Sequence, residues 1–64
     1  MTRIRRGGYV FVAWKGDHDP RHVHVSRDDV EIVKWDLEHH KALTGRASPR
    51  LVEIIKRLQE EGRL

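Results

Sequence analysis

The histidines of this chain gather in one short stretch, GDHDPRHVHV, which runs from residue 16 to residue 25. It holds three of the five histidines in the sequence, His18, His22 and His24, next to the carboxylate of Asp17. Histidine has an unperturbed pKa of about 6.5, so its imidazole can give and accept protons near neutral pH. Three interpretations follow: acid/base catalysis, a metal site, or polar residues on the solvent-facing side of a sheet.

Acid/base catalysis would suit the cleavage of RNA. That reaction, run without a metal, needs a base for the 2′-hydroxyl, an acid for the leaving oxygen and positive charge near the phosphorus. The three residues His18, His22 and His24 supply the base and the acid, and Asp17 supplies a carboxylate that orients an imidazole. On one strand face His22 and His24 stand roughly 7 Å apart, a distance that brackets a phosphate.

Cations surround this cluster. Lys15 and Arg21 lie beside the histidines, and Arg5 and Arg6 lie nearer the N-terminus; we predict that these four bind phosphate. Residues 1–27 hold six Lys or Arg against two Asp. This excess favours an anionic partner such as RNA. The alternative is a basic N-terminal tail that only aids solubility.

The same histidines also have the spacing of a metal site. An H-x-H pair on one strand face, completed by a third histidine, is a ligand set for zinc or nickel, here His18, His22 and His24. The catalytic interpretation needs no cofactor. The third interpretation needs no ligand, because an antiparallel strand places polar residues outside and aspartates in a turn bond to backbone amides. All three interpretations remain open at the level of the sequence.

Three strands are predicted between residues 8 and 37. Residues 9–14 form an aromatic and β-branched run that fits a buried strand. Residues 22–25 alternate with period two, which places both valines on one face and both histidines on the other. In residues 30–37 the apolar positions change parity, which predicts a bulge near Ile32.

One domain spanning residues 1–64 is expected, of the α+β class: a three-stranded antiparallel sheet with one C-terminal helix, in the order β-β-β-α. Residues 1–7 are predicted to be a basic arm. The helix is predicted over residues 48–61, because Ser48 suits the N-cap and apolar residues recur at i, i+3, i+4 and i+7. We expect the helix stripe and the large aromatic residues, Trp14 among them, in the core.

Several classes of protein are excluded or disfavoured by composition. The chain has no cysteine, which excludes disulfides and thiolate metal sites. No apolar run approaches the ~18 residues of a membrane span. The N-terminal residues 1–8 are basic and lack the apolar region of a secretory signal. We therefore expect a cytoplasmic protein with no membrane partner.

The stretch from Asp17 to Val25 reads D-H-x-P-x-H-x-H-V and is followed by a strand and an amphipathic helix. It resembles a small bacterial family of unknown function whose signature is D-H-x-P-P-H-x-H-V. The resemblance covers residues 8–64, and Arg21 stands where the family usually repeats proline. Family members are commonly encoded beside a second small protein in toxin–antitoxin-like pairs. The resemblance therefore implies a cognate antitoxin-like partner in the cytoplasm.

A looser similarity joins the chain to the HicA-type messenger-RNA interferases, which have a G-S-H motif after their first strand. Gly16-Asp17-His18 falls at the equivalent place, and the similarity makes His18 the catalytic candidate. The chain departs from these enzymes where Asp17 replaces serine. It also departs where residues 1–8 are too short for their N-terminal helix, which puts part of their RNA-binding surface in doubt.

The function expected from these observations is that of a small RNA-directed, toxin-like protein of a toxin–antitoxin pair. It would act as a metal-independent ribonuclease or as an RNA binder through the histidine cluster. The alternative is a non-enzymatic interaction module, an antitoxin or a histidine-metal regulator, which binds a partner protein. A homodimer is compatible with either function, because so small a core often needs a partner for stability.

Overall fold

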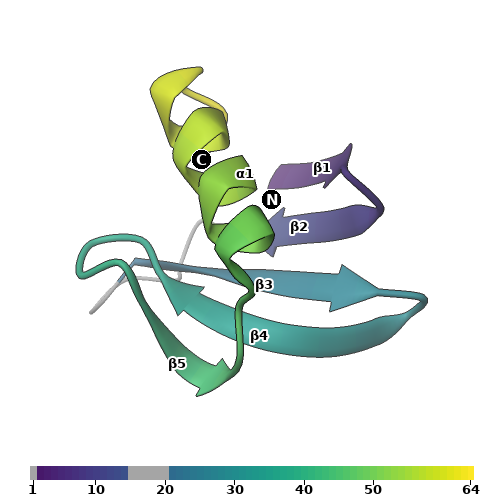
Figure 1. Cartoon of the computed structure of the whole chain (residues 1–64). Helices are drawn as coiled ribbons and strands as arrows, with labels where there is room; N and C mark the ends of the chain where they lie inside the picture. The colour runs from purple at the N-terminus through teal and green to yellow at the C-terminus, as the bar shows by residue number, and fades with distance from the viewer. Residues whose placement is uncertain (1, 15–20) are drawn as a thin grey trace.

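The computed structural model describes residues 2–14 and 21–64 and contains one antiparallel sheet and one helix (Figure 1). The five strands lie in chain order across the sheet, so each pairs with its sequence neighbours. Their bounds are β1 Thr2–Arg6, β2 Tyr9–Ala13, β3 His22–Arg27, β4 Val30–Asp36 and β5 Lys41–Gly45. The helix α1 spans Pro49–Glu60. The α+β class and the C-terminal helix are confirmed.

The prediction of a three-stranded sheet in the order β-β-β-α is wrong, because β1 and β5 add a strand at each edge. Strand β1 occupies the residues that were expected to form a basic arm. It alternates arginine with a single buried residue, Ile4, which pairs with Phe11 of β2. One buried side chain among arginines gives too weak a hydrophobic period to stand out from a solvated tail.

The turn between β1 and β2 explains why so polar a segment pairs at all. Gly7 and Gly8 have φ values of +61° and +83°, and Arg6 and Tyr9 flank them as the last paired residues. Two residues with positive φ form the tight turn whose twist matches that of a hairpin, and glycine adopts it without strain. A Cβ at position 7 would also lie 2.7 Å from the side chain of Ile54 on the helix.

Strand β5 lies outside the three strands predicted between residues 8 and 37, and all five of its residues are exposed. It pairs with β4 through Lys41, Ala42, Thr44 and Gly45, and a shift of register falls beside Leu43. At Gly45 (φ +76°) a Cβ would meet the carbonyl oxygen of Ile32 at 2.0 Å. The backbones approach closely there, and the strand depends on ladder hydrogen bonds rather than on burial.

The core lies between the helix and the face of the sheet that curls around it (Figure 1). Phe11, Val23, Val25, Leu51, Ile55 and Leu58 are among its fully buried side chains. The helix begins as predicted: the hydroxyl of Ser48 accepts a hydrogen bond from the backbone N–H of Leu51 at 3.2 Å. Trp14 was expected in this core, but its side chain is 53% exposed.

Strand β4 contains the bulge predicted near Ile32. Val25 pairs with Val33 and Ser26 pairs with Glu31, so Ile32 has no partner of its own. The extra residue accounts for the change of parity in the apolar pattern of this strand. No helix in the described residues has the length and apolar character needed to cross a membrane.

Candidate nucleic-acid interface

The face of the sheet opposite the helix, here called the outer face, carries most of the chemistry. A row of partners crosses it from strand to strand: Arg3 with Val12, Val12 with His24, His24 with Lys34, and Lys34 with Thr44. Neighbouring strands are about 4.8 Å apart, so this row spans the whole width of the sheet. It places one permanent cation on each side of His24, Arg3 on one side and Lys34 on the other.

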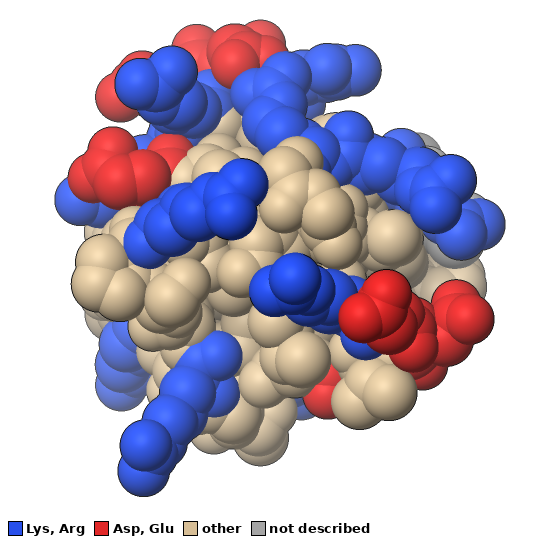
Figure 2. Space-filling view, turned by 45° about the vertical axis from the view of Figure 1, so that its right-hand side comes forward, with Lys and Arg blue, Asp and Glu red and all other residues tan. Residues whose placement is uncertain are grey.

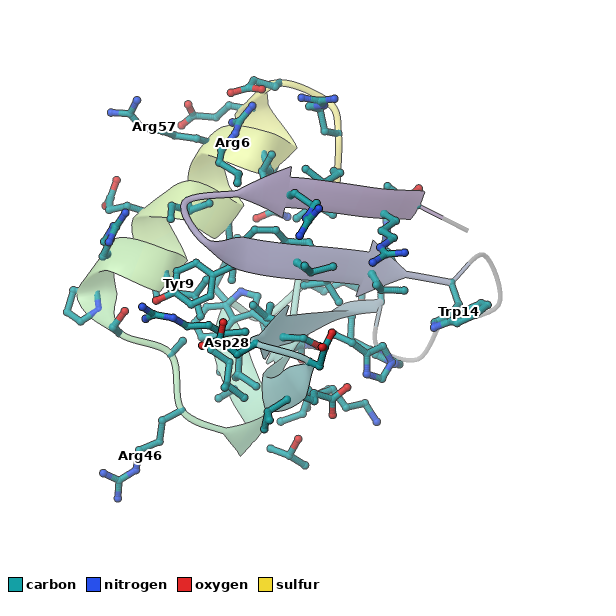
Figure 3. The ribbon with its side chains drawn as sticks, turned by 90° about the vertical axis from the view of Figure 1, so that its right-hand side faces the viewer. Arg6, Tyr9, Trp14, Asp28, Arg46 and Arg57 are labelled. Carbon is teal, nitrogen blue, oxygen red and sulfur yellow. The ribbon has the colours of Figure 1, made fainter. Side chains whose placement is uncertain are left out.

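A second row lies beside the first and runs from Arg5 through Val10 and Ser26 to Glu31. Trp14 follows the end of β2, and in Figure 3 it projects at the opposite side of the view from the helix. Arg3, Val12 and Trp14 take part in lining a hollow of about 320 Å³ on this face. An exposed indole beside cations is the combination that binds an unstacked base and its phosphate.

His22 and His24 both lie on β3, two residues apart, and their side chains are on the same face, as the alternation predicted. The ring centroids are 5.2 Å apart and the planes meet at 76°, an edge-to-face arrangement. Both residues are half-buried. The pair therefore places two imidazoles side by side on the outer face.

Glu31 completes this group from the neighbouring strand. Its Oε1 lies 2.7 Å from Nδ1 of His24. The bulge at Ile32 makes this contact, because it sets Glu31 opposite Ser26 and on the outer face. An ionised carboxylate accepts hydrogen bonds only, so Nδ1 is the donor and carries the proton. The contact thus fixes the orientation and the tautomer of His24.

The other residues predicted at the cluster are distributed unevenly. Lys15, Asp17 and His18 lie outside the described residues. Arg21 is exposed at the entry to β3, and its carbonyl accepts a hydrogen bond from the backbone N–H of Leu37 at 2.9 Å. The described part of the site is therefore His22 and His24, with Arg21 at the end of their strand.

Of the two arginines predicted to bind phosphate in β1, Arg5 lies on the outer face and is exposed. Arg6 is engaged elsewhere: its guanidinium donates to both oxygens of Glu61, at 2.7 and 2.9 Å, beyond the end of the helix. This pair raises the pKa of Arg6 and lowers the pKa of the Glu61 carboxyl. Arg6 thus ties β1 to the helix and is not directed at the histidines.

Figure 2 shows how the charges lie on one side of the molecule. Lys and Arg side chains are distributed across this view with uncharged surface between them, whereas Asp and Glu form separate groups. One acidic pair, Asp28 and Asp29, forms the β3–β4 turn and lines a hollow of about 450 Å³ together with Arg5 and Arg6. The carboxylates at this turn therefore limit the positive potential at one end of the outer face.

Metal-ligating groups converge at a different place. Within residues 2–14 and 21–64, the cluster with ligand atoms within 4.8 Å of one another is Asp36, Glu38 and His39, and it does not include His22 or His24. Asp36 is buried, and its Oδ1 accepts the backbone N–H groups of Glu38 and His39, both at 2.9 Å. Its Oδ2 accepts from Nδ1 of His39 at 2.8 Å. Its oxygens thus hold the β4–β5 turn.

The hydrogen bonds of this turn change the pKa of the Asp36 carboxyl. Burial raises it, but the backbone and side-chain hydrogen bonds from His39 and the backbone hydrogen bond from Glu38 lower it more, and the net pKa falls below its usual range. Hydrogen bonds to the ionised form favour that form. Asp36 is therefore a structural carboxylate.

Sequence reasoning missed three residues of the outer face: Arg3, Glu31 and Lys34. The bulge expected near Ile32 carried a signal for two of them, because a change of parity moves Glu31 and Lys34 to the side of the histidines. Arg3 required the β1–β2 pairing, which was not predicted. Comparison of the chain with models of protein families, with curated proteins and with solved structures finds no match.

Proposed function

We propose that this protein binds single-stranded RNA on the outer face of its sheet. The observation that carries the proposal is the composition of that face: cations at Arg3, Arg5 and Lys34, two adjacent imidazoles, and an exposed indole at Trp14. Cationic grooves that follow the phosphates, with aromatic rings for the bases, bind single strands in many sheet proteins.

The arrangement of the two faces supports a ligand on the outer side. The helix and the core cover the inner face, while the apolar residues of the outer face, Val10 and Val12, remain only half-buried. Because single-stranded bases are unpaired, they can lie flat on such a sheet while phosphates reach the arginines at β1. A duplex would not present its bases to an exposed indole.

The proposal is tested with a labelled single-stranded RNA and fluorescence anisotropy in EDTA over a series of salt concentrations. Replacing Arg3, Arg5 and Lys34 together by glutamine removes three phosphate contacts. The slope of log K against log salt becomes shallower by about 2. The matched control replaces Arg46, Arg50 and Lys56 by glutamine and removes the same charge: Arg50 and Lys56 lie on the helix, which packs on the inner face, and Arg46 follows β5. Equal losses in both variants would contradict an interface on this face.

Trp14 separates base stacking from charge. Stacking on an aromatic ring contributes ~1–3 kcal/mol per base, so Trp14→Ala weakens binding about tenfold and leaves the salt slope unchanged. Trp35 is buried, so RNA-dependent quenching of tryptophan fluorescence arises from Trp14 and disappears in Trp14→Phe. Quenching that persists in Trp14→Phe would remove stacking from the proposal.

The resemblance to families from toxin–antitoxin-like pairs suggests the setting of this RNA binding. We propose that the chain is the RNA-directed toxin of such a pair in the bacterial cytoplasm. Induced expression then slows growth, and the Arg3/Arg5/Lys34 glutamine variant grows at a normal rate. A cognate small protein, expressed together with the chain, restores growth.

A second candidate, an interaction module for a partner protein, is favoured by β5. All five residues of this edge strand are exposed, and one of them, Leu43, is a large apolar residue. Val30, at the start of β4, is an exposed apolar residue outside this strand and serves as the control. An exposed edge accepts a strand from another chain. Leu43→Lys then abolishes copurification of the neighbouring gene's product, while Val30→Lys retains it. Retention in both variants contradicts docking at β5.

A further inference from the structure

The structure places a proton acceptor and a proton donor side by side on the outer face. The imidazoles of His22 and His24 stand with centroids 5.2 Å apart, on adjacent outward positions of one strand. A phosphodiester that crosses this strand has its 2′-oxygen and its 5′-oxygen on opposite sides of the phosphorus. Two imidazoles at this separation can serve one oxygen each.

Glu31 assigns a role to one of the two imidazoles, that of His24. With Nδ1 of His24 donating to the carboxylate at 2.7 Å, a neutral His24 has its lone pair on Nε2. This is the arrangement by which a carboxylate prepares a histidine to act as a base and then stabilises the imidazolium that forms. The adjacent imidazole of His22 then takes the role of the acid.

Positive charge is available at the phosphorus. Lys34 is the direct cross-strand partner of His24, and Arg3 lies two strands away in the same row. A pentacoordinate phosphorus intermediate carries more negative charge on its oxygens than the starting diester. Cations fixed beside it therefore stabilise the transition state more than the ground state.

We propose that His22 and the His24–Glu31 pair cleave the bound RNA, an inference that rests on the proposed RNA binding. Nε2 of His24 takes the proton from the 2′-hydroxyl, and O2′ forms a bond to phosphorus. The bond from phosphorus to O5′ breaks, and O5′ takes a proton from the His22 imidazolium. The products are a 2′,3′-cyclic phosphate and a 5′-hydroxyl, and exchange with water restores both histidines.

Glu31 is a positioning residue in this scheme. Glu31→Gln removes the charge that holds His24, so kcat falls by up to about 10⁴-fold while KM stays unchanged, as for the carboxylate that orients the histidine of a catalytic triad. Glu31→Asp restores part of kcat, because it keeps a carboxylate on the same backbone position. A role in folding alone would change the fraction of folded protein and leave the kcat of the folded fraction intact.

The experiment uses the purified full chain, EDTA, and two oligonucleotides of one sequence: an all-RNA strand and a strand with 2′-deoxyribose throughout. The wild type binds both and cleaves the RNA alone, leaving the cyclic phosphate. His22→Ala and His24→Ala lower the cleavage rate of the bound RNA, measured at saturating protein, by about 10²- to 10⁴-fold. His40→Asn is the matched control, because asparagine tolerates the φ of +54° at that position.

Each outcome separates the inference from the function on which it rests. Binding of both strands without cleavage overturns the inference and leaves the RNA-binding proposal intact. Absence of binding overturns the RNA-binding proposal itself. Cleavage of the deoxy strand, or cleavage that survives both histidine replacements, overturns the mechanism. Activity that requires added zinc or nickel assigns the histidines to a metal instead.

Discussion

The two faces of the sheet are built from neighbouring residues and yet have opposite properties. Phe11 and Val25 point inward and are fully buried, whereas Val12 and His24, one residue away, point outward and are half-buried. The inner face holds the residues that fold the chain, and the outer face holds those that can bind a ligand. Alternation along a strand thus separates the residues that stabilise this 64-residue chain from those of the proposed RNA-binding face.

The separation has one cost for so small a protein. Because the outer face contributes little to the core, the stability of the domain rests on the side chains between sheet and helix. A single core of this size supplies roughly 3–5 kcal/mol of net stability. Substitutions on the inner face should therefore unfold the chain, and substitutions on the outer face should leave it folded but change what it binds.

The largest expected effect comes from Phe11→Ala set against Val12→Ala. Replacing the buried ring leaves a cavity and costs about 3–5 kcal/mol, which is enough to unfold the domain. Val12 is half-buried on the outer face, and its replacement costs about 0.5 kcal/mol. Urea unfolding followed by circular dichroism measures both. Phe11→Leu, which costs less, keeps the comparison measurable if Phe11→Ala does not fold; equal losses at positions 11 and 12 would contradict the division of the faces.

The inner face was largely predictable because its signals are local. The helix followed from the Ser48 cap and from its apolar period, and the strand of His22 and His24 followed from its alternation. Strand β1 also had a local signal, since Gly7-Gly8 between alternating residues is a hairpin turn. Its arginines led to the prediction of a solvated arm, because Ile4 is the one residue of β1 whose side chain is buried in the core.

The outer face was predictable only in part because it depends on register. That His22 and His24 share a face follows from their spacing, but the contact between Glu31 and His24 depends on a bulge in another strand. Strand β5 buries none of its residues, so hydrophobic patterning gives it no signal. Residues without a buried period are placed by ladder hydrogen bonds, and the sequence does not display these.

Asp36, in the turn that joins β4 to β5, should act on the stability of the fold and not on RNA binding. Its folded pKa is lowered, so its contribution to stability is present above the unfolded pKa of about 3.9 and is lost as the pH falls through the folded pKa. Asp36→Asn should therefore lower Tm at pH 7 and make Tm less dependent on pH in the acid range. Glu61 has a lowered pKa as well, so some acid dependence remains until Glu61→Gln is added.

Thermal unfolding between pH 2 and pH 7 measures these slopes by the shift of Tm. The RNA affinity of folded Asp36→Asn at pH 7 should match that of the wild type, because the carboxylate holds a turn and faces the backbone N–H groups of Glu38 and His39. A variant with an unchanged Tm profile would show that the hydrogen bonds of the turn contribute no stability. A loss of RNA binding would place Asp36 in the interface.

The smallest expected effect comes from substitutions in the β3–β4 turn, which should change both the stability of the domain and its RNA affinity. Asp28 and Asp29 have φ values of +52° and +63°, which strain any residue with a Cβ, and Asp29 also lines the outer hollow beside Arg3 and Trp14. The corresponding turn of the first hairpin is Gly7-Gly8 and carries no such strain.

Asp28→Asn with Asp29→Gly should stabilise the domain by about 1 kcal/mol. It should also tighten RNA binding about twofold, because two negative charges leave the rim. Asp29→Asn alone separates the effect of charge from the effect of backbone strain. It removes one negative charge but introduces no glycine, so most of the gain in stability seen in the double variant is absent. If stability rises in the double variant while RNA affinity stays constant, the β3–β4 turn belongs to the fold alone, and the RNA path lies farther along β1 and β2 toward Trp14.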